Sequence, residues 1–231
     1  MGTDTGVGKT YVAALVAREL AAAGHRVGVY KPVASGCRDE AGRLVSDDAL
    51  ALWEAAGRPG TLEQVCPQRF VAPLAPSLAA RAEGRQVDAA ALRRGIEYWQ
   101  ANSDVVLVEG AGGLMSPVSD EDYMADLAYD LGYPLLVVTS NQLGTINRTL
   151  LTLIVAAAYG EGLDVAGLVL NTPAVDPHDA SRASNGVELA ARCVPPLLAE
   201  VAYGGRGLVP PVDWFALARP AVVRTRQSGE W

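Results

Sequence analysis

The sequence opens with a glycine-rich stretch that ends in a Gly-Lys-Thr triplet, residues 2–10, Gly-Thr-Asp-Thr-Gly-Val-Gly-Lys-Thr. Glycines let the backbone turn its N–H groups inward, and the start of a following helix adds a positive dipole that favours phosphate. In such a loop Lys9 reaches the outer phosphates, and the Thr10 hydroxyl can ligate Mg²⁺. Gly2 stands six residues before Gly8, so the loop is one residue longer than the common form. The stretch predicts a nucleotide-binding site.

Two acidic residues are candidates for the metal ion that accompanies a nucleotide. Glu109 ends an uncharged run, residues 105–108, and glycines follow it. A carboxylate at the end of a strand beside a phosphate loop usually contacts Mg²⁺, directly or through water. Asp48, like Asp47, lies in the first turn of an expected helix, where an acidic residue complements the helix dipole whatever its function. Its position alone therefore does not indicate a metal ligand.

Lys31 and the segment after residue 143 are further candidates whose patterns leave two interpretations open. Two lysines at one triphosphate would neutralise charge that develops during phosphoryl transfer, but a charged residue at a strand end is often only solvated. A glycine directly before an expected helix, at Gly144, offers free N–H groups to an anion. Ordinary capping by Thr145 also explains that pattern, and from the pattern alone it is the preferred explanation.

Apolar runs alternate with helical patterns along the chain. Strands are expected at residues 27–30, 105–109, 134–139, 165–170 and 198–203, and helices at 10–23, 47–56, 88–102, 120–131, 144–159 and 179–193. This order predicts an α/β fold with a doubly wound, mostly parallel sheet and helices on both faces. Ligands bind beyond the carboxyl ends of such strands, which places Lys31, Glu109, Thr139 and Asn171 on the edge that carries the phosphate loop.

The domain organisation is simple except at the amino end. Residues 1–218 are expected to form a single domain, residues 58–77 to be mostly irregular because of four prolines, and residues 219–231 to form a loosely ordered tail. A phosphate loop normally follows a buried strand, and here only Met1 precedes it. Either the first strand is missing from this chain, or another segment fills its place.

Composition narrows the possible partners. The net charge of −7 over 231 residues argues against nucleic acid or an anionic membrane surface. No apolar run approaches the ~20 residues that span a bilayer, and no leader with a cleavage site is apparent. Three scattered cysteines suit a reducing cytoplasm, and two histidines make a zinc site or a histidine triad improbable. A cytoplasmic enzyme is expected.

Taken together, several segments resemble the dethiobiotin synthetases, P-loop ligases of biotin synthesis. The matching segments are residues 2–10, 31–36 (Lys-Pro-Val-Ala-Ser-Gly), 46–52, 108–113, 143–147 and Asn171. Their order and spacing agree over roughly residues 2–200, and the longer phosphate loop is the form that the family uses.

The resemblance implies a reaction that needs ATP and Mg²⁺. One amine of 7,8-diaminononanoate takes up CO₂, supplied as CO₂ or bicarbonate, to form a carbamate. ATP phosphorylates the carbamate to a carbamic-phosphoric anhydride, and the second amine closes the ring and releases phosphate. The enzyme then needs mainly to align the groups and balance their charge.

The resemblance also implies residue roles. Lys9 and Lys31 would be catalytic, and Thr10, Asp48 and Glu109 would organise Mg²⁺. The nucleotide contacts would come from Gly6, Val7, Gly8, Lys9, Thr10, Tyr11, Asp48, Glu109, Gly110, Ala111, Gly112 and Asn171, with Asn171 at the base. Thr5 and Ser35 would contact the diamine or carbamate. A homodimer is implied, in which the substrate carboxylate sits on Gly144, Thr145, Ile146 and Asn147 of the other subunit.

Two departures from the family keep alternatives open. The family has a hydrophobic strand before the phosphate loop, and it tends to have Ile-Pro where this chain has Val201-Ala202-Tyr203, which leaves the nucleotide preference undecided. One alternative is a regulatory P-loop ATPase of the partition or cell-division type. Those proteins carry an additional lysine early in the loop, and residues 2–7 contain none. The other is a truncated, inactive ligase chain, because loss of a central strand exceeds ordinary protein stability.

Overall fold

A computed structural model describes residues 1–218, so the tail expected at 219–231 lies outside the described residues. The helices are α1 (Lys9–Ala22), α2 (Asp47–Ala55), α3 (Leu62–Val65), α4 (Pro76–Ala82), α5 (Ala89–Arg94), α6 (Ile96–Asn102), α7 (Met124–Leu131), α8 (Thr145–Ala158), α9 (Arg182–Arg192) and α10 (Trp214–Leu217). The strands are β1 (Val27–Tyr30), β2 (Val33–Ala34), β3 (Arg38–Glu40), β4 (Arg43–Val45), β5 (Gln68–Arg69), β6 (Val105–Val108), β7 (Leu135–Ser140), β8 (Val165–Asn171) and β9 (Leu197–Val201).

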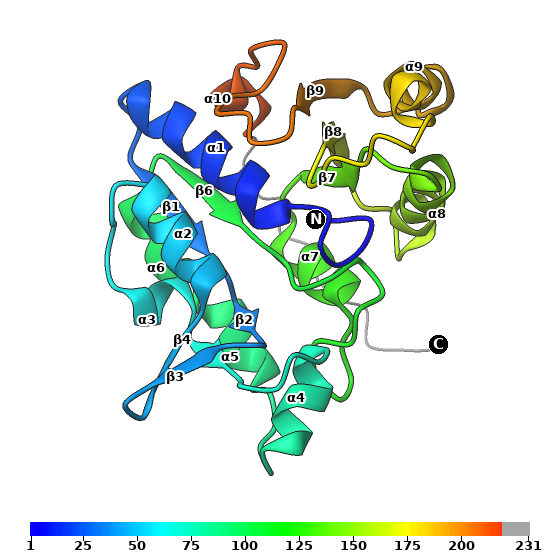
Figure 1. The fold of residues 1–231 in the computed structure, drawn as a ribbon. Coiled ribbons are helices and arrows are strands. Elements are labelled where there is room, and N and C mark those ends of the chain that lie inside the picture. The colour runs from blue at the N-terminus through cyan, green and yellow to red at the C-terminus, as the bar shows by residue number, and fades with distance from the viewer. Residues whose placement is uncertain (219–231) are drawn as a thin grey trace.

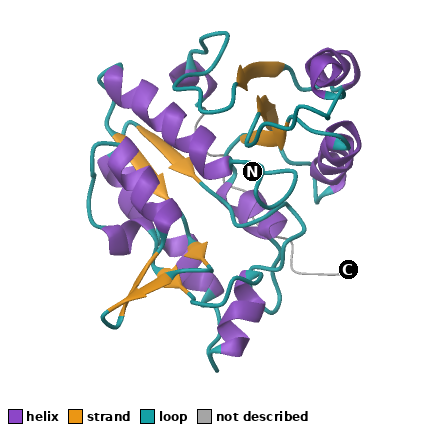
Figure 2. Cartoon of the chain, viewed as in Figure 1, coloured by secondary structure: helices purple, strands orange, loops and turns teal. Residues whose placement is uncertain are grey.

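The main strands run parallel, in two groups. β1 pairs with β6, and β7, β8 and β9 form the second group in that order. Helices lie on both faces of these strands (Figures 1 and 2), which confirms the expected α/β class. The principal core packs α1 and α2 against β1 and includes Leu15, Val29, Leu52 and Trp99. Within the described residues no helix is both long enough and apolar enough to cross a membrane.

The two groups of strands are separated by a gap between β6 and β7, which are not paired with each other within residues 1–218. The first three residues occupy only one end of it. The amino group of Met1 donates to the Leu136 carbonyl at 2.7 Å, the Val138 N–H donates to the Met1 carbonyl at 2.8 Å, and the Thr3 N–H donates to the Val138 carbonyl at 3.0 Å. These bonds form a single parallel bridge at Gly2 rather than a strand.

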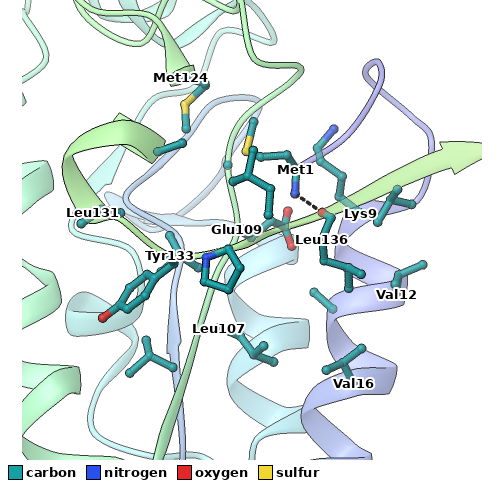
Figure 3. Close-up of a pocket in the computed structure, with 18 of the residues that line it drawn as sticks. Met1, Lys9, Val12, Val16, Leu107, Glu109, Met124, Leu131, Tyr133 and Leu136 are labelled. Atoms are coloured by element: carbon teal, nitrogen blue, oxygen red, sulfur yellow. Dashed lines mark hydrogen bonds between the residues drawn. The ribbon is translucent and has the colours of Figure 1, made fainter. Parts of the chain in front are cut away.

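The rest of the gap is an apolar cavity of about 150 Å³, shown in Figure 3. Val12 and Val16 of α1, Leu107 of β6 and Leu136 of β7 line it. Because no neighbouring strand covers this side of β6, three of its four apolar residues are only partly buried, whereas β1 is buried throughout. Within residues 1–218, only the bridge at Gly2 stands beside β7 where a strand before the phosphate loop would lie.

Several element boundaries differ from those expected. The helix expected at 88–102 breaks at Gly95, where a β-carbon would lie 2.2 Å from the Tyr30 hydroxyl oxygen. The helix expected from residue 120 begins at Met124, because Pro117 and Tyr123 first form an antiparallel bridge. The segment expected to be irregular contains α3, β5 and the first turn of α4.

Candidate active site

The phosphate loop connects the bridge at Gly2 with α1. Gly6 and Gly8 have left-handed φ angles of 74° and 90°, and no side chain of the described part of the chain caps the start of α1. Its first N–H groups are therefore free for an anion. The buried Asn171 side chain donates to the Val7 carbonyl at 2.9 Å and lies so close to Gly8 that a β-carbon there would stand 2.1 Å from its amide nitrogen. Glycine at position 8 is thus required for both the conformation and the space.

Lys31 lies between two carboxylates at the carboxyl end of β1. Its ammonium donates to Glu109 at 2.6 Å and lies 3.1 Å from Asp48. The Lys31 and Glu109 side chains are 4% and 5% exposed, whereas the Asp48 side chain is 51% exposed. Burial alone would lower the pKa of Lys31, but the two carboxylates outweigh burial and raise it above the ordinary value. Lys31 is therefore a fixed positive charge at neutral pH.

Glu109 also connects this ion pair to the phosphate loop. The Thr10 hydroxyl donates to Oε1 of Glu109 at 2.8 Å, and Oε2 of Glu109 is buried with no hydrogen-bond partner among the described residues. A buried carboxylate oxygen without a partner is costly unless a ligand satisfies it. Thr10, Asp48 and Glu109 supply oxygen ligands, the kind that Mg²⁺ prefers.

These three residues fit Mg²⁺ held partly by phosphate and water rather than by protein alone. Within residues 1–218 no group of three or more His, Cys, Asp or Glu side chains could hold a metal ion. Mg²⁺ in nucleotide enzymes usually takes one or two carboxylates and completes its shell with water and phosphate oxygens. The site, with the two carboxylates of Asp48 and Glu109 and the hydroxyl of Thr10, fits this shared coordination.

Lys9 lies at the mouth of the same site. Its ammonium donates to the Asp4 carbonyl at 2.9 Å, within the phosphate loop itself. Burial and the nearby positive charge of Lys31 lower the pKa of Lys9, against the opposing effect of Glu109. The two lysines therefore experience different electrostatic environments although they line one cavity.

That cavity has a volume of about 430 Å³. It brings together most of the residues predicted from the sequence: Thr5, Gly6, Gly8, Lys9, Thr10, Tyr11, Lys31, Ser35, Asp48, Glu109, Gly110, Ala111 and Gly112. Val7 and Asn171 lie outside its lining. Val7 belongs to the core, and the Asn171 amide is hydrogen-bonded to the phosphate loop at the Val7 carbonyl.

The residues expected to receive a carboxylate, Gly144, Thr145, Ile146 and Asn147, form the start of α8, away from this cavity. Gly144 has a left-handed φ of 89°, and among residues 1–218 no side chain caps the start of α8. Capping by Thr145 is therefore a wrong explanation of the pattern. The Thr145 hydroxyl is fully buried and bonds to Thr139 at 2.7 Å instead.

Two features of the site were missed from the sequence. Asp4 lies in the phosphate loop, where its carbonyl accepts from Lys9 and its carboxylate lies 3.8 Å from Arg148 of α8. The Tyr11 hydroxyl donates to the Gly205 carbonyl at 2.6 Å, which links α1 to the segment after β9. Neither contact follows a recognisable sequence spacing, because each joins segments more than 100 residues apart.

Family and sequence comparisons match most of this chain to known proteins. Residues 1–202 match a family described as an AAA domain. The chain is 44% identical over 212 residues to the ATP-dependent dethiobiotin synthetase BioD of Rhodopirellula baltica, covering 87% of this chain and 81% of that protein. It is 46% identical to BioD of Anaeromyxobacter dehalogenans strain 2CP-C over 189 residues, 82% of each chain. The solved structure of cell division protein ftsY from Thermotoga maritima has a TM-score of 0.51 at 17% identity, over 94% of this chain and 65% of that one, which concerns the fold alone.

Proposed function

The chain belongs to the dethiobiotin synthetase family, and from this membership we propose how its residues carry out an ATP-dependent ring closure. It is a ligase that uses ATP to form dethiobiotin. The named relatives favour this activity over that of a regulatory ATPase of the partition or cell-division type. The observation that carries the residue assignment is the buried Lys31 ammonium held between Glu109 and Asp48 beside Thr10.

In this proposal Lys31 and Lys9 are the catalytic cations. Lys31 keeps its proton, because the pKa of its ammonium is raised, so it stabilises negative charge and does not act as a base. Phosphorylation of a carbamate gathers anionic oxygens from two reactants at one place. The two ammonium groups, which line one cavity, would hold the γ-phosphate and the carbamate at reacting distance.

Mg²⁺ would be held by Thr10, Asp48 and Glu109, where it neutralises phosphate charge. The unpartnered oxygen of Glu109 supports this assignment. Gly6, Val7, Gly8, Tyr11, Gly110, Ala111 and Gly112 would surround the nucleotide. Asn171 is proposed to reach the base while its amide supports the loop at Val7.

The diamine substrate would lie between Thr5, Ser35 and the start of α8 in a second subunit. An exposed apolar stripe on α8 supports a homodimer: the Leu151 and Ile154 residues are 54% and 62% exposed, and Leu143, just before the helix, is 78% exposed. Exposed apolar side chains gathered on one helix face are typical of an interaction surface. The stripe continues from Gly144 and Asn147, so pairing along α8 would bring its start to the other subunit.

The three cysteines, Cys37, Cys66 and Cys193, are all free thiols. Unpaired cysteines are usual in a reducing compartment. We therefore propose that the enzyme works in the cytoplasm.

The proposal is tested by following phosphate release and dethiobiotin formation together. Release from MgATP should require both the diamine and bicarbonate, and comparable ATP turnover without them would support the regulatory ATPase instead. Lys31→Met, which keeps the length of the side chain without its charge, should abolish product while nucleotide binding stays measurable. Arg38→Ala is the matched control, because Arg38 is an exposed cation whose ion pairs within residues 1–218 are with Asp47 and Glu40. A fully active Lys31→Met enzyme would remove Lys31 from the mechanism.

A further inference from the structure

Four threonine hydroxyls from three separate segments meet at Thr139, the fifth residue of β7. Thr139 Oγ1 lies 3.1 Å from the hydroxyl of Thr3 and 2.7 Å from that of Thr145, and it accepts from Thr149 at 3.0 Å. Thr139, Thr145 and Thr149 are fully buried, and Thr3 is partly buried. We call these residues the threonine cluster.

The hydrogen-bonding capacity of Thr139 is used completely in this arrangement. A hydroxyl donates one hydrogen bond and accepts two, and Thr139 has three hydroxyl neighbours. Thr149 lies inside α8, where a threonine often bonds to the carbonyl four residues earlier, but here it donates to Thr139. A buried network with every member satisfied holds its elements in one arrangement, because any displacement leaves a buried hydroxyl unpaired.

The threonine cluster joins the phosphate loop to α8. Thr3 begins the loop and Thr145 is the first residue of α8. A second contact joins the same two segments: the Asp4 carboxylate lies 3.8 Å from Arg148 of α8. Because the Thr145 hydroxyl is directed into the cluster, a ligand at the start of α8 would meet backbone N–H groups and the exposed Asn147 side chain instead.

We propose that Thr139 is a positioning residue, which fixes the start of α8 relative to the phosphate loop and thereby sets where the substrate carboxylate is held. The inference rests on the proposed function, in which the start of α8 receives that carboxylate from the diamine of the other subunit. Thr139 touches neither ATP nor diamine in this account. Its hydroxyl acts through Thr145 on one side and Thr3 on the other.

The test uses the Thr139→Val variant, which keeps the shape of the side chain and removes the hydroxyl. Its kinetics are measured with two substrates, 7,8-diaminononanoate and the same diamine without the carboxylate. Misplacement of a bound group by about 1 Å can cost up to about a hundredfold in rate. We expect kcat/KM for the carboxylate-bearing diamine to fall at least about tenfold, mainly through KM. The value for the diamine without a carboxylate, and the ATP affinity measured without diamine, should change less than about twofold.

Three further variants separate positioning from a general loss of stability. Thr139→Ser restores the hydroxyl and should restore the KM. Thr3→Val removes only the link to the loop and should give the same change in KM even if Thr139→Val folds poorly. Thr152→Val is the matched control on α8, because the Thr152 hydroxyl bonds to the Arg148 carbonyl of its own helix and is not part of the cluster.

The outcomes distinguish this inference from the proposed function. If the unaltered enzyme uses both diamines equally well, the carboxylate site on α8 is wrong, and the inference fails with it. If the unaltered enzyme prefers the carboxylate and Thr139→Val and Thr3→Val keep that preference, the inference alone is overturned. A lower Tm with unchanged kinetic parameters likewise assigns Thr139 to the core.

Discussion

The chain contains two lysines, Lys9 and Lys31, and its other cationic side chains are arginines. Both lysines line the candidate cavity. An ammonium group is a compact charge with rotatable donors, whereas a guanidinium has a rigid fork, so lysine suits a site where phosphate and carbamate oxygens change position during a reaction. The surface, in contrast, pairs its carboxylates with arginine, as at Arg26 and Asp104.

The presence of only two lysines makes their charge states directly measurable. Lysine labelled with ¹⁵N at Nζ should give two side-chain ammonium signals from this protein. We expect the pKa of Lys31 to lie above the ordinary 10.5 and that of Lys9 below it, because carboxylates surround Lys31 while burial and a like charge act on Lys9. A pH titration of the two signals, assigned with Lys31→Met, measures both values. The reverse order would contradict the electrostatic account of the site.

The adjacent acids Asp47 and Asp48 should differ sharply in function. The sequence places both in the first turn of a helix, but the structure pairs Asp47 with exposed Arg38 and directs Asp48 to Lys31. Asp48→Asn should raise the Mg²⁺ concentration for half-maximal activity at least about tenfold. Its effect on stability should stay within about 0.5 kcal/mol, since Asp48 is half exposed. Asp47→Asn is the matched control and should leave the Mg²⁺ dependence unchanged; equal effects of the two variants would exclude the metal role.

Among the elements, α5 and α6 meet at Gly95, a position where the packing of Tyr30 leaves no room for a side chain. Gly95 has φ and ψ of −60° and −18°, which alanine also adopts, but its β-carbon would lie 2.2 Å from Tyr30 Oη. Gly95→Ala should therefore lower the free energy of unfolding by about 1–3 kcal/mol through overpacking. Chemical denaturation measures this loss. Gly207→Ala is the control, because nothing lies within 4 Å of its position.

Tyr30→Phe should partly relieve the Gly95→Ala defect, because it removes the hydroxyl that the new methyl group meets. The relief is incomplete, since a β-carbon would also lie 2.7 Å from Tyr30 Cζ. Tyr30→Phe alone leaves the Leu92 carbonyl without its donor and should itself destabilise by about 1 kcal/mol. If the two losses simply add in the double variant, contact with the Tyr30 hydroxyl is not the cause of the Gly95→Ala loss.

The sequence predicted the elements that depend on local patterns and missed those that depend on distant contacts. Ser46 caps α2 as expected, and β1 has the predicted bounds. The requirement for glycine at position 95 comes from Tyr30, 65 positions away, and no local pattern reveals it. At the site, residue types predicted the cavity-lining side chains, but the contact of Thr139 with Thr3 joins positions 136 residues apart. Such contacts arise from the parallel topology, which places distant strand ends together.

For the whole molecule, the gap between β6 and β7 is the feature that limits stability. A central strand of a parallel sheet normally buries both faces and both edges, and here the adjoining side of β6 borders a cavity of about 150 Å³. Met1 takes the position of a backbone N–H in this gap: its amino group donates to Leu136 as a strand residue would. A terminal amino group therefore stands in this gap where a strand would place a peptide N–H.

That amine should make stability depend on pH, and an added strand should remove the dependence. Burial, aided by the charge of Lys9, lowers the pKa of the Met1 amino group from 8.0 to about 5. Unfolding between pH 5 and pH 8 then takes up a proton, so the free energy of unfolding rises with pH over this window.

An extension of about five valine and isoleucine residues joined to Met1 should abolish this rise and increase Tm by at least about 5 °C, because each apolar side chain contributes about 1.5–3 kcal/mol on full burial. An extension of equal length with alternating prolines cannot pair with both edges, so it should abolish the pH effect without the gain in Tm. Calorimetry at pH 5.5 and pH 8, with intact mass confirming that Met1 is retained, measures both effects, and equal Tm values for the two extensions would show that the gap does not receive a strand.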